Sequence, residues 1–277
     1  MRWTFVAERG HRLRLKDVEP DYHADLDRAD AEAVIDRLGD ELGELADLLF
    51  YAGSHALLVI LQGRDTAGKD GTIRRILRYV NAQSCRVVPF KVPVGPEIEH
   101  DFLWRVHMQV PGRGSIALFN RSHYEDVLVV RVHKLAPEEV WRRRYDHINA
   151  FEELLLDNQT IIVKLLLHIS KEEQAERLLE RERDTEKAWK LNVSDWQERE
   201  LWDAYTEAYE DVLERCSTPH APWHVVPADH KWFRDAAVIR CLVEALRPYR
   251  EEWLNHLREL AEVRKRELEQ YRQQHPG

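Results

Sequence analysis

Five short stretches of the chain are almost continuously apolar, and longer stretches of mixed or periodic polarity separate them. Strands buried on both faces of a parallel sheet have this composition, whereas half-buried strands alternate apolar and polar positions. Long connections between such strands are typical of helices that cover both faces of the sheet. The pattern therefore predicts a three-layer α/β/α sandwich with a five-stranded parallel sheet. The predicted strands span residues 57–62, 85–92, 115–119, 160–169 and 222–227.

Helical periodicity marks several of the segments between these strands. Residues 1–53 form a predicted helical N-terminal extension, because their second half repeats apolar residues at the spacing of one helix face. A second amphipathic helix follows the first strand. Ser170 and Ser194 each begin a capping-box pattern, and Pro137 suits the first turn of a helix. The apolar positions of the two periodic segments are Val34, Leu38, Leu42, Leu45 and Leu49, then Ile73, Ile76, Leu77 and Val80.

Residues 250–277 predict a long and highly charged C-terminal helix. Its thin apolar stripe includes Trp253, Leu257 and Leu260. Such a stripe suits either a partner helix or the edge of the core. The sequence contains no internal repeat and no low-complexity linker, so we expect a single domain over residues 1–277.

Charge and cysteine content restrict the class of protein. The net charge of −9 argues against nucleic-acid binding over the whole surface, because such binding depends on phosphate neutralisation. An anionic ligand therefore needs a local basic site. The three cysteines are widely separated and form no CxxC pair, which indicates reduced packing residues. We see no secretory leader and no apolar stretch long enough to cross a bilayer, so we expect a cytoplasmic protein without a membrane partner.

The first predicted strand runs into a glycine-rich loop with the pattern GxxxxGK. Backbone amides in such a loop, together with the positive end of the following helix, favour a phosphate group, and Lys69 adds a charge. The usual motif continues with Ser or Thr, but that position is Asp70 here, and Asp65 lies inside the loop. Two carboxylates beside a polyanion site require a cation. The alternative is an ordinary tight turn with an exposed lysine. The predicted phosphate-binding positions are Gly63, Ala67, Gly68, Lys69 and Gly71.

A second group of polar residues follows the third strand, where an open parallel sheet binds its ligands. Asn120 stands where related ATP-using proteins often place an acid, so that role could pass to Glu125 or Asp126. Arg121 can bind phosphate oxygens with both arms of its guanidinium. The alternative for Glu125, Asp126 and Arg131 is an internal salt-bridge cluster that stabilises this segment.

Three motifs together resemble the polyphosphate kinase 2 family. They are GRDTAGKDG at 63–71, DFLWRVHMQVP at 101–111 and FNRSHYEDVLVVRVH at 119–133. Residues 175–200 also resemble the helical lid module of that family. The basic residues of the lid and its flanks are Arg177, Arg181, Lys187 and Lys190. The sequence departs from the family at 94–97, where a Thr-centred turn is common. The sequence of residues 119–133 most resembles that of the subgroup that phosphorylates both nucleoside mono- and diphosphates.

The resemblance implies a P-loop kinase that transfers the terminal phosphoryl group of inorganic polyphosphate to AMP or ADP, with guanine nucleotides as further candidates. It implies Mg²⁺ as cofactor, with Mn²⁺ as an alternative ion, and a homo-oligomer, either a dimer or a tetramer. The implied catalytic residues are Asp65, Lys69, Asp70, Arg121, Arg177 and Arg181, and the implied metal ligands are Asp65, Asp70 and Asp126. Further phosphate contacts are expected from Arg181, Lys187 and Lys190, and nucleotide contacts from Asn120, Arg121, Tyr124, Glu125 and Arg131.

Two other functions use some of the same features. An ATP-dependent nucleotide kinase of the thymidylate or adenylate kinase type shares the P-loop, the sheet and an arginine lid, but Asp70 in the Ser/Thr position argues against it. A non-catalytic sensor would bind a nucleotide or a polyanion without turnover. Phosphoryl transfer from polyphosphate without added ATP separates both from the polyphosphate kinase hypothesis.

Overall fold

The computed structural model describes residues 2–183 and 193–275. Two predicted phosphate contacts, Lys187 and Lys190, lie outside this part of the chain. In the described residues, no helix is long and apolar enough to span a membrane. All three cysteines are free thiols, and Cys216 and Cys241 are buried as expected for packing residues.

The centre of the protein is one sheet with the strand order β1-β6-β5-β2-β4-β3. Five of these strands are parallel and coincide with the five predicted apolar stretches. The sequence analysis missed β1, which has only two residues and pairs antiparallel with β6 at the edge. The strands are β1 Phe5–Val6, β2 Ala56–Gly63, β3 Cys85–Pro89, β4 Ile116–Asn120, β5 Thr160–His168 and β6 Trp223–Pro227.

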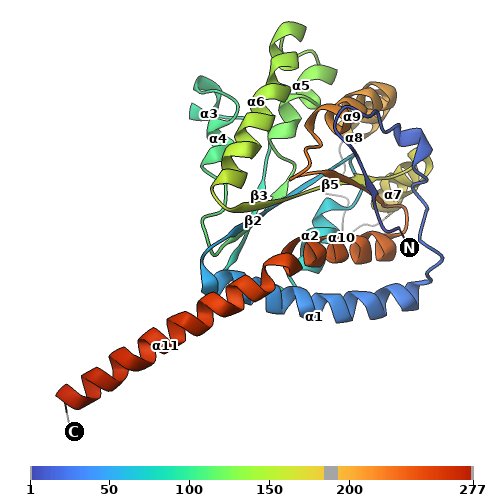
Figure 1. Cartoon of the computed structure of the whole chain (residues 1–277). Helices are drawn as coiled ribbons and strands as arrows, with labels where there is room; N and C mark the ends of the chain where they lie inside the picture. Colours follow the sequence, from blue (N-terminus) through green and yellow to red (C-terminus); the bar gives the residue numbers. More distant parts are fainter. Residues whose placement is uncertain (1, 184–192, 276–277) are drawn as a thin grey trace.

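Helices cover both faces of the sheet, which confirms the three-layer sandwich (Figure 1). Every residue of β2 is buried. Leu57, Val59 and Leu61 pack into the core beneath α1, α2 and α10, whereas Leu58 and Ile60 pack into the core beneath α6 and α9. Two apolar faces explain why the strand is an unbroken apolar run. The covering helices are α1 Arg28–Ala52, α2 Lys69–Ile76, α10 Lys231–Leu246, α6 Glu138–Asp157 and α9 Trp202–Cys216.

The lid region contains two helices, α7 Lys171–Arg183 and α8 Val193–Glu200. The Ser170 hydroxyl accepts a hydrogen bond from the Glu173 amide at 3.1 Å, so the predicted cap of α7 is confirmed. The second predicted cap is wrong, because α8 begins before Ser194 and includes it. The short helices are α3 Pro96–Glu99, α4 Trp104–His107 and α5 Val129–Val132, and single 3₁₀ turns span Leu15–Asp17, His123–Asp126 and Arg247–Tyr249.

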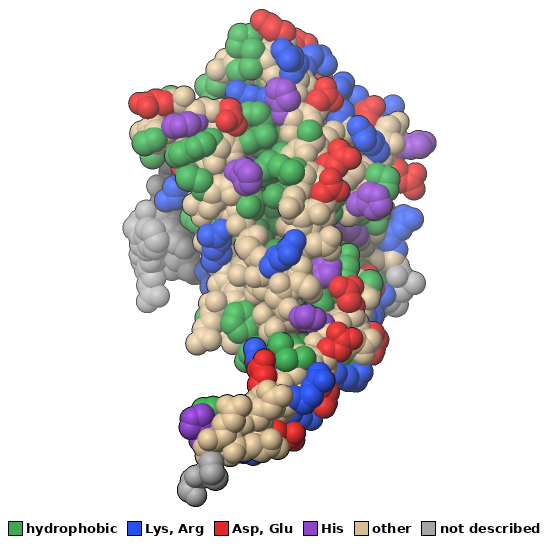
Figure 2. All heavy atoms as spheres, turned by 60° about the vertical axis from the view of Figure 1, so that its left-hand side comes forward, with side chains coloured by type: hydrophobic (Ala, Val, Ile, Leu, Met, Phe, Trp, Pro, Cys, Tyr) green, Lys and Arg blue, Asp and Glu red, His purple; other side chains and the backbone are tan. Residues whose placement is uncertain are grey.

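The C-terminal helix α11, Arg250–Gln274, projects away from the body of the protein (Figure 1). Trp253 is its buried residue and packs near α1. Residues after Leu260 are exposed through the described end of the helix. Lys, Arg, Asp and Glu side chains alternate along this projecting part (Figure 2). The beginning of the helix is therefore packed against the body of the protein, and the part after Leu260 is exposed to solvent.

Candidate functional site

A cavity of about 720 Å³ opens beside the carboxyl ends of β2, β3 and β4. Residues 63–65 reach it from β2, residues 90–93 from β3, and Arg121 from β4. This is the edge where parallel sheets bind ligands. Hydrophobic side chains are also exposed on the face of the molecule that Figure 2 shows. The aromatic and aliphatic side chains of the wall are Phe90, Val92, Pro93, Ile98, Phe102, Val129, Val130, Leu135, Trp202, Tyr205 and Tyr209.

The glycine-rich loop joins β2 to α2 in the predicted order of strand, loop and helix. Gly68 has φ = 103°, in the region that favours glycine, and Lys69 is the first residue of α2. The Lys69 ammonium donates to the carbonyls of Gly63 at 2.6 Å and Arg64 at 3.0 Å. An ammonium has three donors, so one is left for a ligand. Burial lowers the pKa of Lys69 to about 8.

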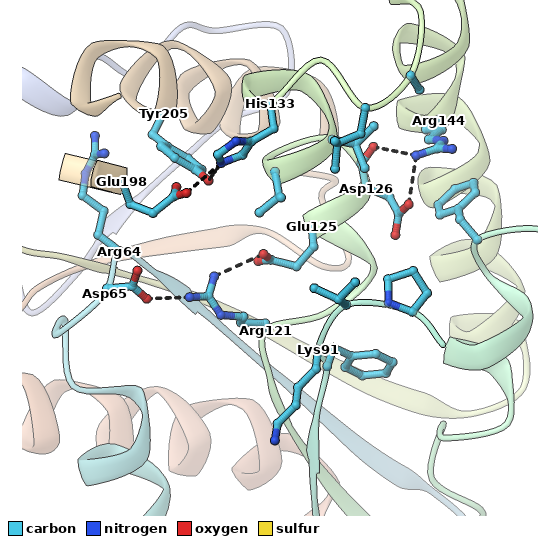
Figure 3. Close-up of a pocket in the computed structure, with 18 of the residues that line it drawn as sticks. Arg64, Asp65, Lys91, Arg121, Glu125, Asp126, His133, Arg144, Glu198 and Tyr205 are labelled. Atoms are coloured by element: carbon cyan, nitrogen blue, oxygen red, sulfur yellow. Dashed lines mark hydrogen bonds and ion pairs between the residues drawn. The ribbon is translucent and has the colours of Figure 1, made fainter. Parts of the chain in front are cut away.

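Arg121 links the loop to the cavity wall (Figure 3). Its guanidinium donates to Asp65 at 2.6 Å and to Glu125 at 3.1 Å, so it lies between the two carboxylates. Burial opposes its charge, but Glu125 and Asp65 outweigh burial and raise the pKa of Arg121. The residue has φ = 64°, which is rare for a side chain other than glycine and common at functional sites. Beside it, the Asn120 amide donates to Asp70 at 2.6 Å.

Tyr124 is a core residue, so its prediction as a nucleotide contact is wrong. It is fully buried, and its hydroxyl donates to Glu152 at 2.7 Å and accepts from Lys164 at 3.1 Å. The 3₁₀ turn over His123–Asp126 explains the error, because it turns its first two residues inward and its last two toward the cavity. The sequence analysis treated Tyr124 as facing the ligand together with Glu125 and Asp126.

Arg131 is engaged in an ion-pair cluster, as the alternative interpretation expected. Its guanidinium donates to Asp211 at 2.6 Å and to Glu207 at 2.8 Å. It also lies over the Trp141 ring, 4.8 Å from the centroid. These contacts tie α5 to α6 and α9 and hold the arginine away from the residues that line the cavity. The structure therefore contradicts its prediction as a nucleotide contact.

Asp126 does line the cavity, but arginines occupy its carboxylate. Arg144 donates to it at 2.9 Å (Figure 3), and Arg105 approaches it to 4.0 Å. Burial raises the pKa of Asp126 in spite of these cations. In the part of the chain that the structure describes, no three Asp, Glu, His or Cys side chains gather as a metal site. The described residues therefore do not bring the predicted ligands Asp65, Asp70 and Asp126 together as one group, and which of them bind a metal stays a prediction.

The two predicted lid arginines differ in their surroundings. Arg177 is buried and donates to backbone carbonyls, among them Thr66 at 2.9 Å and Ala228 at 2.7 Å, so it supports the loop instead of facing a ligand. Arg181 is partly exposed and pairs with Asp195 of α8 at 3.1 Å. The structure thus corrects the catalytic role predicted for Arg177, whereas the role of Arg181 in binding an anion stays a prediction.

The sequence analysis missed several residues of the cavity wall. Arg64 lies over the Trp202 ring, 3.7 Å from the centroid, and donates to the Thr206 hydroxyl at 2.5 Å. His133 and Glu198 pair at 2.8 Å across the same wall (Figure 3). The helical spacing of the aromatic residues of α9 was a signal in the sequence, because positions three and seven apart share a helix face. Those aromatic residues are Trp202, Tyr205 and Tyr209.

Comparison with known proteins agrees with this geometry. A model of the family described as polyphosphate kinase 2 (PPK2) matches residues 25–252. The AMP/ADP-polyphosphate phosphotransferase of Meiothermus ruber is 48% identical over 240 residues, which cover 85% of this chain and 89% of that protein. The ADP-polyphosphate phosphotransferase of Rhodopseudomonas palustris is 42% identical over 247 residues, covering 85% of this chain and 84% of that protein.

A solved structure supports the same conclusion for the fold. The crystal structure of polyphosphate kinase 2 from Arthrobacter aurescens TC1 superposes with a TM-score of 0.83 at 40% identity, covering 87% of this chain and 90% of that chain. This similarity confirms the predicted P-loop kinase-like architecture. The sequence motifs, the loop geometry and the comparisons agree, and the chain belongs to the polyphosphate kinase 2 family of enzymes.

Proposed function

We propose that the protein transfers the terminal phosphoryl group of inorganic polyphosphate to AMP and to ADP, in the presence of Mg²⁺. The observation that carries this proposal is the position of Arg121, which contacts Asp65 of the phosphate loop and Glu125 of the cavity wall. One guanidinium thereby joins a donor side and an acceptor side. The relative from Meiothermus ruber, named for both AMP and ADP, supports the choice of acceptors.

The donor side suits a polyanion without a base or a sugar. The amides of the glycine-rich loop, the positive end of α2 and the remaining donor of Lys69 all favour phosphate oxygens. Phosphoryl transfer passes through a loose transition state, so alignment and charge neutralisation matter more than covalent catalysis. Lys69 and Arg121 are the cations of the described chain that are placed to neutralise the transferring group.

The acceptor side combines an apolar wall with a few charges. Phe90, Ile98 and Phe102 offer surfaces for a nucleobase, and Arg105 and Arg144 lie farther along the same wall. The buried Oε1 of Glu125 has no hydrogen-bond partner in the described residues, so it can accept from a ligand hydroxyl or a coordinated water. These features suit a nucleotide whose phosphate approaches Arg121 and whose base lies against the apolar wall.

Two carboxylates fit the proposed magnesium ion. Mg²⁺ in kinases is held by one or two carboxylates together with substrate phosphates and water. Asp65 in the loop and Asp70 in the first turn of α2 supply that number, and their contacts to Arg121 and Asn120 involve one oxygen of each. The ion, when bound, would neutralise charge on the donor phosphates.

We further propose that the protein is a cytoplasmic homo-oligomer.

The test is formation of ADP and ATP from AMP with magnesium and long-chain polyphosphate, without added ATP. Lys69→Ala and Asp65→Asn should each lower turnover by at least about a hundredfold, because the first removes a cation that neutralises the transferring group and the second removes a carboxylate proposed to hold the magnesium ion. Activity within about twofold of wild type in both variants would contradict the mechanism. Product from ADP alone would limit the acceptor to diphosphates, and transfer that requires ATP would favour an ATP-dependent kinase.

A further inference from the structure

Each backbone carbonyl from Gly63 to Ala67 accepts a hydrogen bond from a side chain outside the loop. Lys69, the first residue of α2, donates to the carbonyls of Gly63 and Arg64. The Asp65 carbonyl accepts from Gln174 at 3.1 Å, the Thr66 carbonyl from Arg177 at 2.9 Å, and the Ala67 carbonyl from Arg234 at 3.3 Å. The last three donors belong to α7 and α10, which are remote from the loop in sequence. The loop is thus held from two independent helices.

The direction of these carbonyls determines the direction of the amides. A peptide unit is planar and trans, so its N–H points opposite to its C=O. Holding the carbonyls of Asp65 and Ala67 toward α7 and α10 therefore turns the amides of Thr66 and Gly68 the other way. Successive amides that face one concavity form an anion site, whereas a carbonyl turned into it would repel phosphate.

Arg234 is built into this position. It is 3% exposed, and Asp235 accepts from its Nε at 2.9 Å and from its Nη2 at 2.7 Å. The guanidinium lies so close to Gly68 that a Cβ at that position would overlap it. Asp235 also accepts from Thr72 of α2 at 3.3 Å, so the same carboxylate fixes the arginine and the helix that follows the loop.

Gln174 and Arg177 connect the loop to the lid helices. Gln174 is 3% exposed and accepts from Arg199 of α8 at 3.3 Å while it donates to the loop. Arg177 donates to Ala228 and Asp229 as well as to Thr66, which links α7, the loop and the segment after β6. The three donors therefore surround one short stretch of backbone and leave it little freedom.

We propose that Gln174 and Arg234 are positioning residues that orient the amides of Thr66 and Gly68 toward the polyphosphate donor, and that Arg177 holds the loop backbone between them, where the Ala67 amide donates to the Arg64 carbonyl. This inference rests on the proposed role of the loop as the donor site. Arg177 and Arg234 act through the backbone and do not line the cavity, whereas Gln174 also lines it. Loss of the Arg234 or Gln174 bond should therefore weaken donor binding more than acceptor binding, because Phe90, Ile98 and Phe102 of the proposed base-binding wall belong to other elements.

The test compares Arg234→Met and Gln174→Met with wild type in steady-state kinetics with polyphosphate and AMP. Each variant keeps the approximate size of the side chain and removes its hydrogen bond to the loop. The KM for polyphosphate should rise by about tenfold, and the KM for AMP should stay within about twofold. Arg75→Met is the matched control, because Arg75 pairs with Glu32 and with the same Asp235 at the back of the loop. It should leave both KM values within about twofold of wild type.

The outcomes are separable. An equal rise of both KM values, or the same rise in Arg75→Met, would indicate a general structural role and overturn the proposal. Unchanged donor KM in both variants, with turnover lost in Lys69→Ala, would overturn the positioning role and keep the donor site. Wild-type turnover and donor KM in Lys69→Ala would instead refute the loop as donor site. If Arg234→Met fails to fold, Gln174→Met decides, because Gln174 is uncharged and its loss leaves Arg199 with the Lys171 carbonyl as an acceptor.

Discussion

Gly68 is a position where both the backbone conformation of the loop and the space around it require glycine. Its φ of 103° is strained for any side chain, and a Cβ would overlap Arg234. We expect Gly68→Ala to lower the free energy of unfolding by at least about 1–3 kcal/mol, since such backbone conformations cost that much. Denaturant unfolding of the variant measures the loss. Gly112→Ala is the control, because a Cβ there meets open space; an equal loss in both variants would contradict this reasoning.

The residues whose placement the sequence predicted best are those whose surroundings depend on neighbours in the chain. Lys69 and Asp65 lie where they were predicted because a strand, a glycine loop and a helix follow one another directly. Tyr124 and Arg131 were misassigned because burial and ion pairing depend on α6 and α9, which are distant in sequence. Arg234 gave no signal at all, since a lone arginine in an apolar helix shows its purpose only when the loop packs against it.

At the scale of elements, a buried ion pair joins the sheet to the layer above it. Lys164 of β5 donates to Glu152 of α6 at 2.5 Å, to the Cys216 carbonyl at the end of α9 at 2.6 Å, and to Tyr124. Burial alone would raise the pKa of Glu152, but Lys164 and His123 outweigh it and lower that pKa. Each charge of this buried pair is therefore stabilised by the other.

We expect Lys164→Met to cost about 3–5 kcal/mol in the free energy of unfolding, because it leaves Glu152 buried without its cation. The double variant Lys164→Met/Glu152→Leu should recover much of that loss, since two apolar side chains of similar volume replace the pair. Chemical denaturation of both variants measures the difference. Arg142→Ala, which breaks an exposed pair with Glu138, should cost below about 1 kcal/mol. If Lys164→Met lost no more free energy of unfolding than Arg142→Ala, the dependence of Glu152 on Lys164 would be refuted.

The strands were predicted more reliably than the ends of the helices. Buried parallel strands have to be apolar throughout, so their composition alone marks them. The two-residue β1 has no such pattern and exists because β6 offers an open edge. The start of α8 was misplaced because Ser194 looks like a cap from sequence, although the helix already includes it.

At the scale of the whole molecule, α11 extends beyond the body that carries the site. Truncation after Leu260 should change the free energy of unfolding by less than about 1 kcal/mol and leave turnover unchanged, because the removed residues that the structure describes are exposed. Denaturant unfolding measures the first quantity, and formation of ADP and ATP from AMP and polyphosphate measures the second. The native mass of the truncated chain, measured by light scattering, adds a second result. A smaller number of protomers than in the full-length protein would assign the proposed oligomer contact to this helix, and an unchanged number would assign it to the body.

The docked end of α11 depends on one neutral histidine. Trp253 is fully buried and donates from Nε1 to Nδ1 of His55 at 3.1 Å, and burial lowers the pKa of His55, with Glu252 opposing and Arg113 adding to the shift. The unfolded chain therefore binds a proton that the folded chain resists, so this contribution is complete above the ordinary pKa of 6.5 and declines as the pH falls below it.

The substitution His55→Asn offers Trp253 an amide oxygen as an acceptor that does not titrate, so we compare wild type with this variant by denaturant unfolding between about pH 7 and pH 5. The stability advantage of wild type over the variant should shrink as the pH falls. His168 and His224, whose pKa values burial also lowers, are present in both proteins, so their contributions cancel. Parallel stability curves would show that the contact between the body and α11 does not depend on the protonation of His55.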